Sequence, residues 1–172
     1  MNPLEPKRVS ESAIQDQTYR VFPNDLNSND TVFGGLVMAI LDRTASVVAE
    51  RHSGFTCVTA SVDAMHFLAP AERGDVLLFR ASVNRTWRTS MEIGTKVFAE
   101  HPRTREVRHI LSAYFTFVAL DDNRKPAVIP AVIAETEAEK RRYYEADIRR
   151  QRRQIDAEER RQRRLKDQPE RL

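Results

Sequence analysis

The chain has 172 residues, 41% of them hydrophobic, which is enough for one globular domain with an appendage. Its single cysteine, Cys57, excludes an intrachain disulfide, and no apolar run is long enough to span a bilayer. The first residues lack the apolar stretch of a secretory signal, so we expect a cytoplasmic protein without membrane insertion. The net charge of +3 arises in residues 135–172, where acids interleave with bases, and this favours a solvated helix over nucleic-acid binding.

The first half of the chain predicts a short strand followed by one helix. Residues 1–16 are polar and contain prolines, so we expect a flexible N-terminal segment. Residues 18–22 alternate like a strand that stops at a proline, and a loop rich in turn formers follows. From residue 33 apolar side chains recur at steps of three and four, which predicts a helix ending near Gly54. Apolar and small residues cover most of its circumference, so the helix is expected to be buried on all sides.

Four long strands are expected after the helix, over residues 55–68, 76–87, 91–101 and 106–120, because apolar and polar residues alternate there. Their short connections favour an antiparallel meander. The pattern predicts an α+β domain over residues 17–130, with the sheet curled around the helix and its edges covered by self-association. Residues 131–172 form a charged extension, read as one long helix over 131–166 with a thin apolar stripe.

The loop and helix near residue 33 contain the residues best suited to chemistry. Asp42 is a lone carboxylate on an apolar helix, where it is either a general base or nucleophile for an ester-like carbonyl, or the partner of Arg43 or of a neighbouring chain. Asn27 either orients a water or carbonyl, or caps its loop. The amides of Gly34 and Gly35 are either an oxyanion hole or the result of close helix packing.

Other kinds of site find little support in the sequence. Cys57 is either a nucleophilic thiol or an apolar strand residue, and no base lies beside it in the sequence. The four histidines lack metal-ligand spacing and are read as strand or surface residues. No glycine-rich phosphate loop or serine nucleophile motif is present. We therefore expect neither a metal nor a redox cofactor.

Several separate segments follow one another in an order that matches a known family. They are Pro23-x-Asp25-x-x-Asn27, Phe33-Gly34-Gly35, Leu41-Asp42, Val58–Asp63, Phe67-Leu68, Gly74-Asp75, Thr89–Ile93 and Ala113–Val118. Together they resemble the hotdog-fold acyl-CoA thioesterases. Residues 135–143 resemble the tail of the cytosolic long-chain acyl-CoA hydrolases in particular. Asp30 departs from the pattern, because relatives commonly have glycine there.

The resemblance implies a hotdog fold in which Asp42 and Asn27 form the catalytic pair, donated by different subunits of a dimer. It implies that the helix start at Gly34 and Gly35 holds the carbonyl oxygen. It also implies coenzyme A contacts along two strands, with Arg150, or else its neighbours 149 or 152, near the phosphates. The implied contacts on the strands are Ala60, Ser61, Val62, Thr89, Ser90 and Met91.

The implied reaction is hydrolysis of fatty acyl-CoA to free fatty acid and CoA, so that CoA is part of the substrate rather than a cofactor. The implied assembly is a homohexamer built as a trimer of dimers, with the dimer as the minimal active unit. Two alternatives stay open at this point. One is a hotdog thioesterase for acyl-carrier-protein or aryl-CoA substrates, and the other is a non-catalytic module that binds acyl-CoA.

Overall fold

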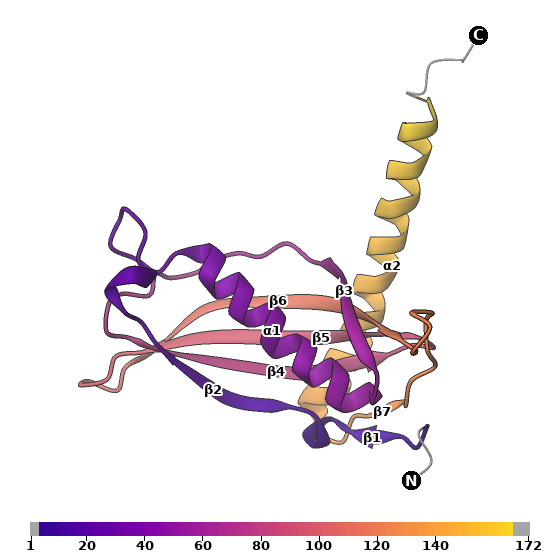
Figure 1. The fold of residues 1–172 in the computed structure, drawn as a ribbon, viewed down its shortest axis with the longest axis horizontal. Coiled ribbons are helices and arrows are strands. Elements are labelled where there is room, and N and C mark those ends of the chain that lie inside the picture. The colour runs from indigo at the N-terminus through magenta and orange to yellow at the C-terminus, as the bar shows by residue number, and fades with distance from the viewer. Residues whose placement is uncertain (1–3, 167–172) are drawn as a thin grey trace.

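The protein is described by a computed structural model that covers residues 4–166. A five-stranded antiparallel sheet carries one helix across each face, α1 on the inner face and α2 on the outer face (Figure 1). The strand order is β2-β4-β5-β6-β3, and a separate two-stranded parallel ribbon pairs β1 with β7. The elements are β1 (Lys7–Arg8), β2 (Ile14–Arg20), α1 (Gly34–Ser53), β3 (Thr56–Val62), β4 (Val76–Thr86), β5 (Ser90–Glu100), β6 (Val107–Leu120), β7 (Val132–Ile133) and α2 (Glu137–Lys166).

The helix α1 forms where the sequence predicts it. It ends at Gly54, whose φ of 76° is the left-handed conformation that glycine adopts without strain, and the Gly54 N–H donates to the Glu50 carbonyl. Leu41, Ala45 and Val48 are fully buried against the sheet. The opposite face of α1 is open, with Met38 43% exposed, so the prediction of burial on all sides is wrong for the single chain.

The sheet follows the predicted alternation along β4, β5 and β6. Inward side chains such as Phe79, Met91, Phe115 and Phe117 are fully buried and form the core under α1. These three strands form the predicted meander, but β3 does not continue it. Instead β3 pairs with β6 at the far edge of the sheet, and it stops at Val62 rather than at residue 68. The outer edge of β3 therefore carries no strand within the described chain.

A flexible segment is expected over residues 1–16, of which residues 1–3 lie outside the described range, and residues 4–16 differ from that expectation. Lys7 and Arg8 form β1 against β7, and Val9 is buried in the core. The Lys7 ammonium donates to the carbonyls of Arg51 and His52 at the end of α1, at 3.1 and 2.8 Å. This segment therefore covers the C-terminal end of the helix.

The helix α2 begins at Glu137, six residues later than expected, because β7 and a short extended stretch precede it. Its first half lies against the outer face of the sheet, where Ala146 is fully buried. Its second half extends beyond the sheet (Figure 1), and the side chains of residues 154–165 are all exposed. No helix in the described range is both long and apolar enough to cross a membrane.

Candidate active site

Asp42 lies on the side of α1 that faces β3. The Thr59 hydroxyl donates a 2.6 Å hydrogen bond to Asp42 Oδ1, which orients the carboxylate while leaving it partly accessible. The bond to Thr59, rather than one to Arg43, is the contact that the structure gives this carboxylate. The sequence reasoning missed Thr59. The signal was available, since Thr59 lies inside the segment Val58–Asp63 that carries the family resemblance.

A β-bulge follows Thr59 directly. Thr59 pairs with Phe117 and Ser61 with Thr116, so Ala60 is the extra residue on β3. Bulges bend a strand and redirect its side chains, and they are frequent beside active sites. The bulge lets Thr59 turn toward Asp42 while Ser61, two residues later, lines the grooves described below.

Asn27 lies in the loop before α1 and organises that loop. Its Oδ1 accepts from the backbone N–H groups of Asn29 and Thr31, at 2.8 and 3.3 Å, and its Nδ2 donates to Thr31 Oγ1 at 3.0 Å. The loop-capping interpretation is thus present in the single chain. Asp30 within the same loop has a φ of 57°, a left-handed conformation that glycine adopts at lower cost than aspartate.

The start of α1 is closely packed by two aromatic rings. A Cβ on Gly35 would lie 2.3 Å from the Phe33 ring, and one on Gly34 would lie 3.3 Å from the Phe67 ring. Their N–H groups precede the first acceptor within the helix and point out of its positive end. Gly34 and Asn27 line one cavity of about 400 Å³, whose other walls are mostly apolar. Close packing therefore occurs together with amides that have no acceptor within the helix.

Asp42 does not line this cavity. It lies eight residues along α1 from Gly34, about 12 Å at the helical rise. Within one chain the structure does not bring Asp42 and Asn27 together: no hydrogen bond joins them among the described residues, and the cavity at Asn27 is not lined by Asp42.

Three of the residues implied for coenzyme A binding meet in a groove on the outer face of the sheet. Ser61, Ser90 and Arg150 line this groove, whose volume is about 270 Å³. The Arg150 guanidinium lies 4.4 Å from the centre of the Trp87 ring and donates a 3.4 Å hydrogen bond to Ser90 Oγ. Burial, together with the nearby Arg153, lowers the pKa of Arg150 below its usual value. The positive charge of the Arg150 guanidinium is therefore incompletely compensated, and an anionic ligand would stabilise it.

A second groove, of about 630 Å³, adjoins the first along α2. Ser61 and Val62 line it together with Arg152 and Arg153. The other implied contacts lie elsewhere. Ala60 and Thr89 line none of the described cavities, and the Met91 side chain is fully buried in the core on the inner face.

A buried carboxylate holds α2 to the outer face. Glu92 is fully buried and accepts hydrogen bonds from Arg149 at 2.7 Å, from Arg153 at 3.0 Å and from Asn84 at 3.0 Å. Arg153 also pairs with Asp63 at 2.7 Å. The sequence reasoning missed this cluster. Arg149 and Arg153 lie on either side of Arg150 in the sequence of α2. Their ion pairs with Glu92 therefore hold in place the part of α2 that carries Arg150.

Other candidate centres find no support. Cys57 is buried, and burial raises the pKa of its thiol, which keeps it protonated. No group of three or more potential metal-ligating side chains comes together among the described residues. His52, expected in a strand or at the surface, is fully buried at the end of α1.

Sequence comparison places the chain among known proteins. Residues 29–106 match the model of the Thioesterase superfamily. The chain is 42% identical over 123 residues to the uncharacterized acyl-CoA thioester hydrolase YkhA of Bacillus subtilis, covering 72% of each protein. The chain belongs to the hotdog-fold acyl-CoA thioester hydrolases. A second member, the cytosolic acyl coenzyme A thioester hydrolase of Rattus norvegicus, is 36% identical over 84% of this chain and 38% of its own length.

Solved structures of acyl-CoA hydrolases show the same fold. The hydrolase of Staphylococcus aureus, solved with butyryl coenzyme A and coenzyme A, is 37% identical with a TM-score of 0.85, covering 91% of this chain and 96% of that one. Structures of the same hydrolase exist for alanine variants of an aspartate, a threonine and an asparagine. A hexameric acyl-CoA thioesterase is 37% identical with a TM-score of 0.85, covering 88% and 97% of the two chains.

Proposed function

We propose that the chain hydrolyses fatty acyl-CoA to the free fatty acid and CoA, using Asp42 of one subunit and Asn27 of its partner. The observation that carries this proposal is the Asp42 carboxylate, oriented by Thr59 and accessible beside the uncovered edge of β3. The alanine variants of the Staphylococcus aureus hydrolase replace the same three residue types, an aspartate, a threonine and an asparagine. Membership of the family supports the reaction class.

In the proposed reaction Asp42 takes a proton from a water molecule, and the water oxygen attacks the thioester carbon. The carbonyl oxygen becomes negative in the intermediate, and the N–H groups at the start of α1 stabilise that charge. The carbon–sulfur bond then breaks, the carboxylic acid is released, and the CoA thiolate takes up a proton. Direct attack by Asp42 on the carbonyl is the other route, in which water hydrolyses a mixed anhydride afterwards.

The proposed assembly completes each site with a second chain. Pairing of two β3 edges would extend the sheet and cover the exposed face of α1, where Met38 and Val47 lie open. Association of three such dimers would give the homohexamer, and a similar thioesterase is a hexamer. We further propose that the protein works in the cytoplasm, as the name of the rat relative indicates for that protein, and that it binds neither nucleic acid nor membranes.

We also propose that the reaction needs no metal and no redox cofactor, because water and the named side chains account for every proton transfer. Turnover of palmitoyl-CoA is expected to persist after dialysis against EDTA and to be unchanged by added Mg²⁺ or Zn²⁺. Loss of turnover that a single added metal restores would contradict this expectation.

Subunit complementation tests the shared site. Chains carrying Asp42→Ala and chains carrying Asn27→Ala are co-expressed with different tags, and the mixed oligomer is isolated. If each site draws one residue from each of two chains, a mixed dimer contains one intact site and recovers about half of the wild-type turnover. Each variant assembled with itself is the matched control and should stay inactive. A mixed dimer without turnover would place both residues in a site made by one chain.

The alternatives make different predictions for substrate choice. The grooves beside Arg150 and Arg153 contain more cationic groups than a carrier-bound phosphopantetheine requires, which favours free CoA esters. Turnover of palmitoyl-CoA, benzoyl-CoA and palmitoyl-carrier protein separates the fatty acyl-CoA hydrolase from the aryl-CoA and carrier-protein enzymes. Tight CoA binding without hydrolysis of any of them would support the non-catalytic module.

A further inference from the structure

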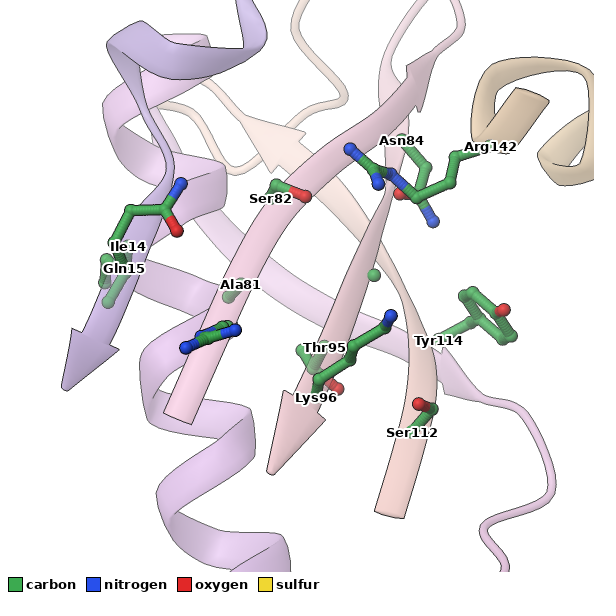
Figure 2. A pocket seen from close by; sticks show the side chains of 12 residues that line it. Ile14, Gln15, Ala81, Ser82, Asn84, Thr95, Lys96, Ser112, Tyr114 and Arg142 are labelled. Carbon is green, nitrogen blue, oxygen red and sulfur yellow. The ribbon is translucent and has the colours of Figure 1, made fainter. Parts of the chain in front are cut away.

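A polar hollow lies on the outer face of the sheet, apart from both grooves described above. Figure 2 shows it between β2, the middle strands and the first turns of α2. Its volume is about 280 Å³, and it shares no lining residue with the cavities at Asn27 or Arg150. The side chains that matter here are Arg80, Ser82, Asn84, Lys96, Tyr114 and Arg142.

The hollow carries positive charge from two side chains without a salt bridge, and only the Arg142 charge is partly offset, by Glu139 one turn earlier on α2. Lys96 and Arg142 both line it, and neither forms a salt bridge with any described residue. Arg80, at the β2 side, is paired with Asp16 at 2.6 Å and contributes less. No aspartate or glutamate is among the lining residues. Two cations that converge on a hollow without an acidic lining residue attract an anion.

Two buried polar atoms at the hollow lack partners. Asn84 is only 2% exposed, and its Nδ2 donates to Glu92, which fixes Oδ1 as the atom left without a donor. The Nε–H of Arg142 is buried and has no acceptor. Figure 2 shows the Arg142 and Asn84 side chains lying close to each other at the upper end of the hollow. Buried polar groups are rarely left unpaired, and a ligand that both accepts and donates hydrogen bonds would satisfy these two atoms.

The space for these atoms depends on Gly94. A Cβ at this position would lie 2.6 and 2.7 Å from the amide atoms of Asn84, so any other residue would displace the Asn84 side chain. Gly94 is on β5 directly beside Lys96, in a strand interior where glycine otherwise weakens the sheet. The glycine therefore keeps the amide in place at the floor of the hollow.

We propose that this hollow binds inorganic phosphate. The phosphate oxygens accept hydrogen bonds from Arg142 Nε and from the Lys96 ammonium. The hydroxyl that hydrogenphosphate retains at neutral pH donates to Asn84 Oδ1. Sulfate has the same size and charge but carries no hydroxyl at this pH, so it leaves Asn84 unpaired. The hollow thus discriminates between two anions that a simple cationic patch would bind alike.

Titration calorimetry of the full chain with sodium phosphate tests the proposal, in chloride buffer at constant ionic strength and pH 7.5. We expect saturable binding that is at least about tenfold tighter than that of sulfate, since the acceptor Asn84 penalises an anion without a hydroxyl. Equal affinity for both anions would overturn the proposal, as would the absence of saturable phosphate binding.

Variants locate the binding. Lys96→Gln should weaken phosphate binding about tenfold, because it removes a charge-assisted contact from an exposed side chain that the fold does not need. Ser82→Asp should abolish binding by placing a negative charge in the hollow. Lys125→Gln, at an exposed lysine on a distant turn, is the matched control and should bind as the wild type does. Arg150→Gln tests the other groove: if it removes phosphate binding and Lys96→Gln does not, the proposal is wrong.

Discussion

The two helices of this chain are held to the same sheet by opposite means. On the inner face, α1 packs through fully buried apolar residues such as Leu41, Ala45 and Val48. On the outer face, α2 is fixed by the buried Glu92 and by the guanidinium groups of Arg149 and Arg153. Apolar packing is not directional and tolerates changes of salt and pH, whereas an ionic cluster depends on charge and geometry.

The two means of attachment, apolar packing for α1 and ion pairs for α2, correspond to the functional residues that each helix carries. Asp42 on α1 belongs to the proposed chemistry, which needs a carboxylate held in one place by a rigid core. Arg150 on α2 belongs to the proposed recognition of the substrate phosphates, and its position follows that of its charged neighbours. If both proposals hold, the residues for reaction and those for recognition lie on the two opposite faces of one sheet. The experiments below test that separation.

Asp42→Asn is expected to have the largest effect. It keeps the hydrogen bond from Thr59 and removes the basic oxygen, so kcat for palmitoyl-CoA should fall by about 10²–10⁴-fold with little change in KM. Circular dichroism and size-exclusion chromatography verify that the assembly is intact. Arg43→Gln, one residue along at an exposed position, is the control and should retain kcat within about twofold. An Asp42→Asn variant that turns over normally would exclude Asp42 from the chemistry.

Glu92→Gln should cost the most stability on the outer face. It leaves two largely buried guanidinium groups without their shared counter-charge, and the free energy of unfolding should decrease by about 3–5 kcal/mol. Urea unfolding measures this decrease. Glu145→Gln is the control. It removes a carboxylate that is 44% exposed on α2 and should lower the free energy of unfolding by about 1 kcal/mol or less. Equal costs for both variants would mean that the cluster does not hold α2.

Arg150→Gln should affect recognition and leave the chemical step alone. Loss of one charge-assisted contact predicts a rise of about tenfold in KM for acyl-CoA, with kcat nearly unchanged. Steady-state kinetics at fixed ionic strength provide the measurement. Arg141→Gln, an exposed arginine on the same helix, is the matched control. A fall in kcat without a change in KM would contradict the separation of the two faces.

The smallest effect is expected from pH acting on His52. Its Nε2–H donates to the Pro130 carbonyl at 3.2 Å, and burial lowers the pKa of the ring below its ordinary value of 6.5. The unfolded chain therefore binds a proton that the folded chain excludes. Stability should be full above about pH 6.5 and should decline below it, by at most about 1.4 kcal/mol per pH unit. Thermal unfolding between pH 5 and 8 measures this slope.

His52→Gln removes the titrating ring and retains a hydrogen-bonding side chain, so its stability should vary less between pH 5 and 6.5 than that of the wild type. His66→Gln, at an exposed histidine, is the control and should keep the wild-type slope. If the slope survives in His52→Gln, another group is responsible for it.

Much of the fold was predictable because its signals are local. The helix period and the glycine at position 54 gave α1 nearly to the residue, and alternation gave β4, β5 and β6. The position of β3 was not predictable in the same way, because strand pairing depends on contacts far apart in the sequence. The N-terminal segment was also misjudged, since β1 is held by backbone hydrogen bonds and by Lys7, which composition does not reveal.

The candidate site divides in the same way. Asp42 stood out as a lone carboxylate on an apolar helix, and Thr59 could have been found from its place in the matching segment. Glu92 also lies in a matching segment, Thr89–Ile93, but its burial could not be predicted, because it alternates outward on β5 and only α2, 45 residues later, buries it. The pairing of Asp42 with Asn27 depends on a second chain and remains a prediction.

The unpaired edge of β3 also affects how newly made chains assemble, before any catalysis takes place. Val58 and Val62 are more than 40% exposed on this strand, and a newly made chain offers it to any extended peptide nearby. A monomer in the cell would be prone to aggregate as well as unable to complete a site. The fraction of chains that assemble correctly instead of aggregating should therefore depend on the protein concentration during expression.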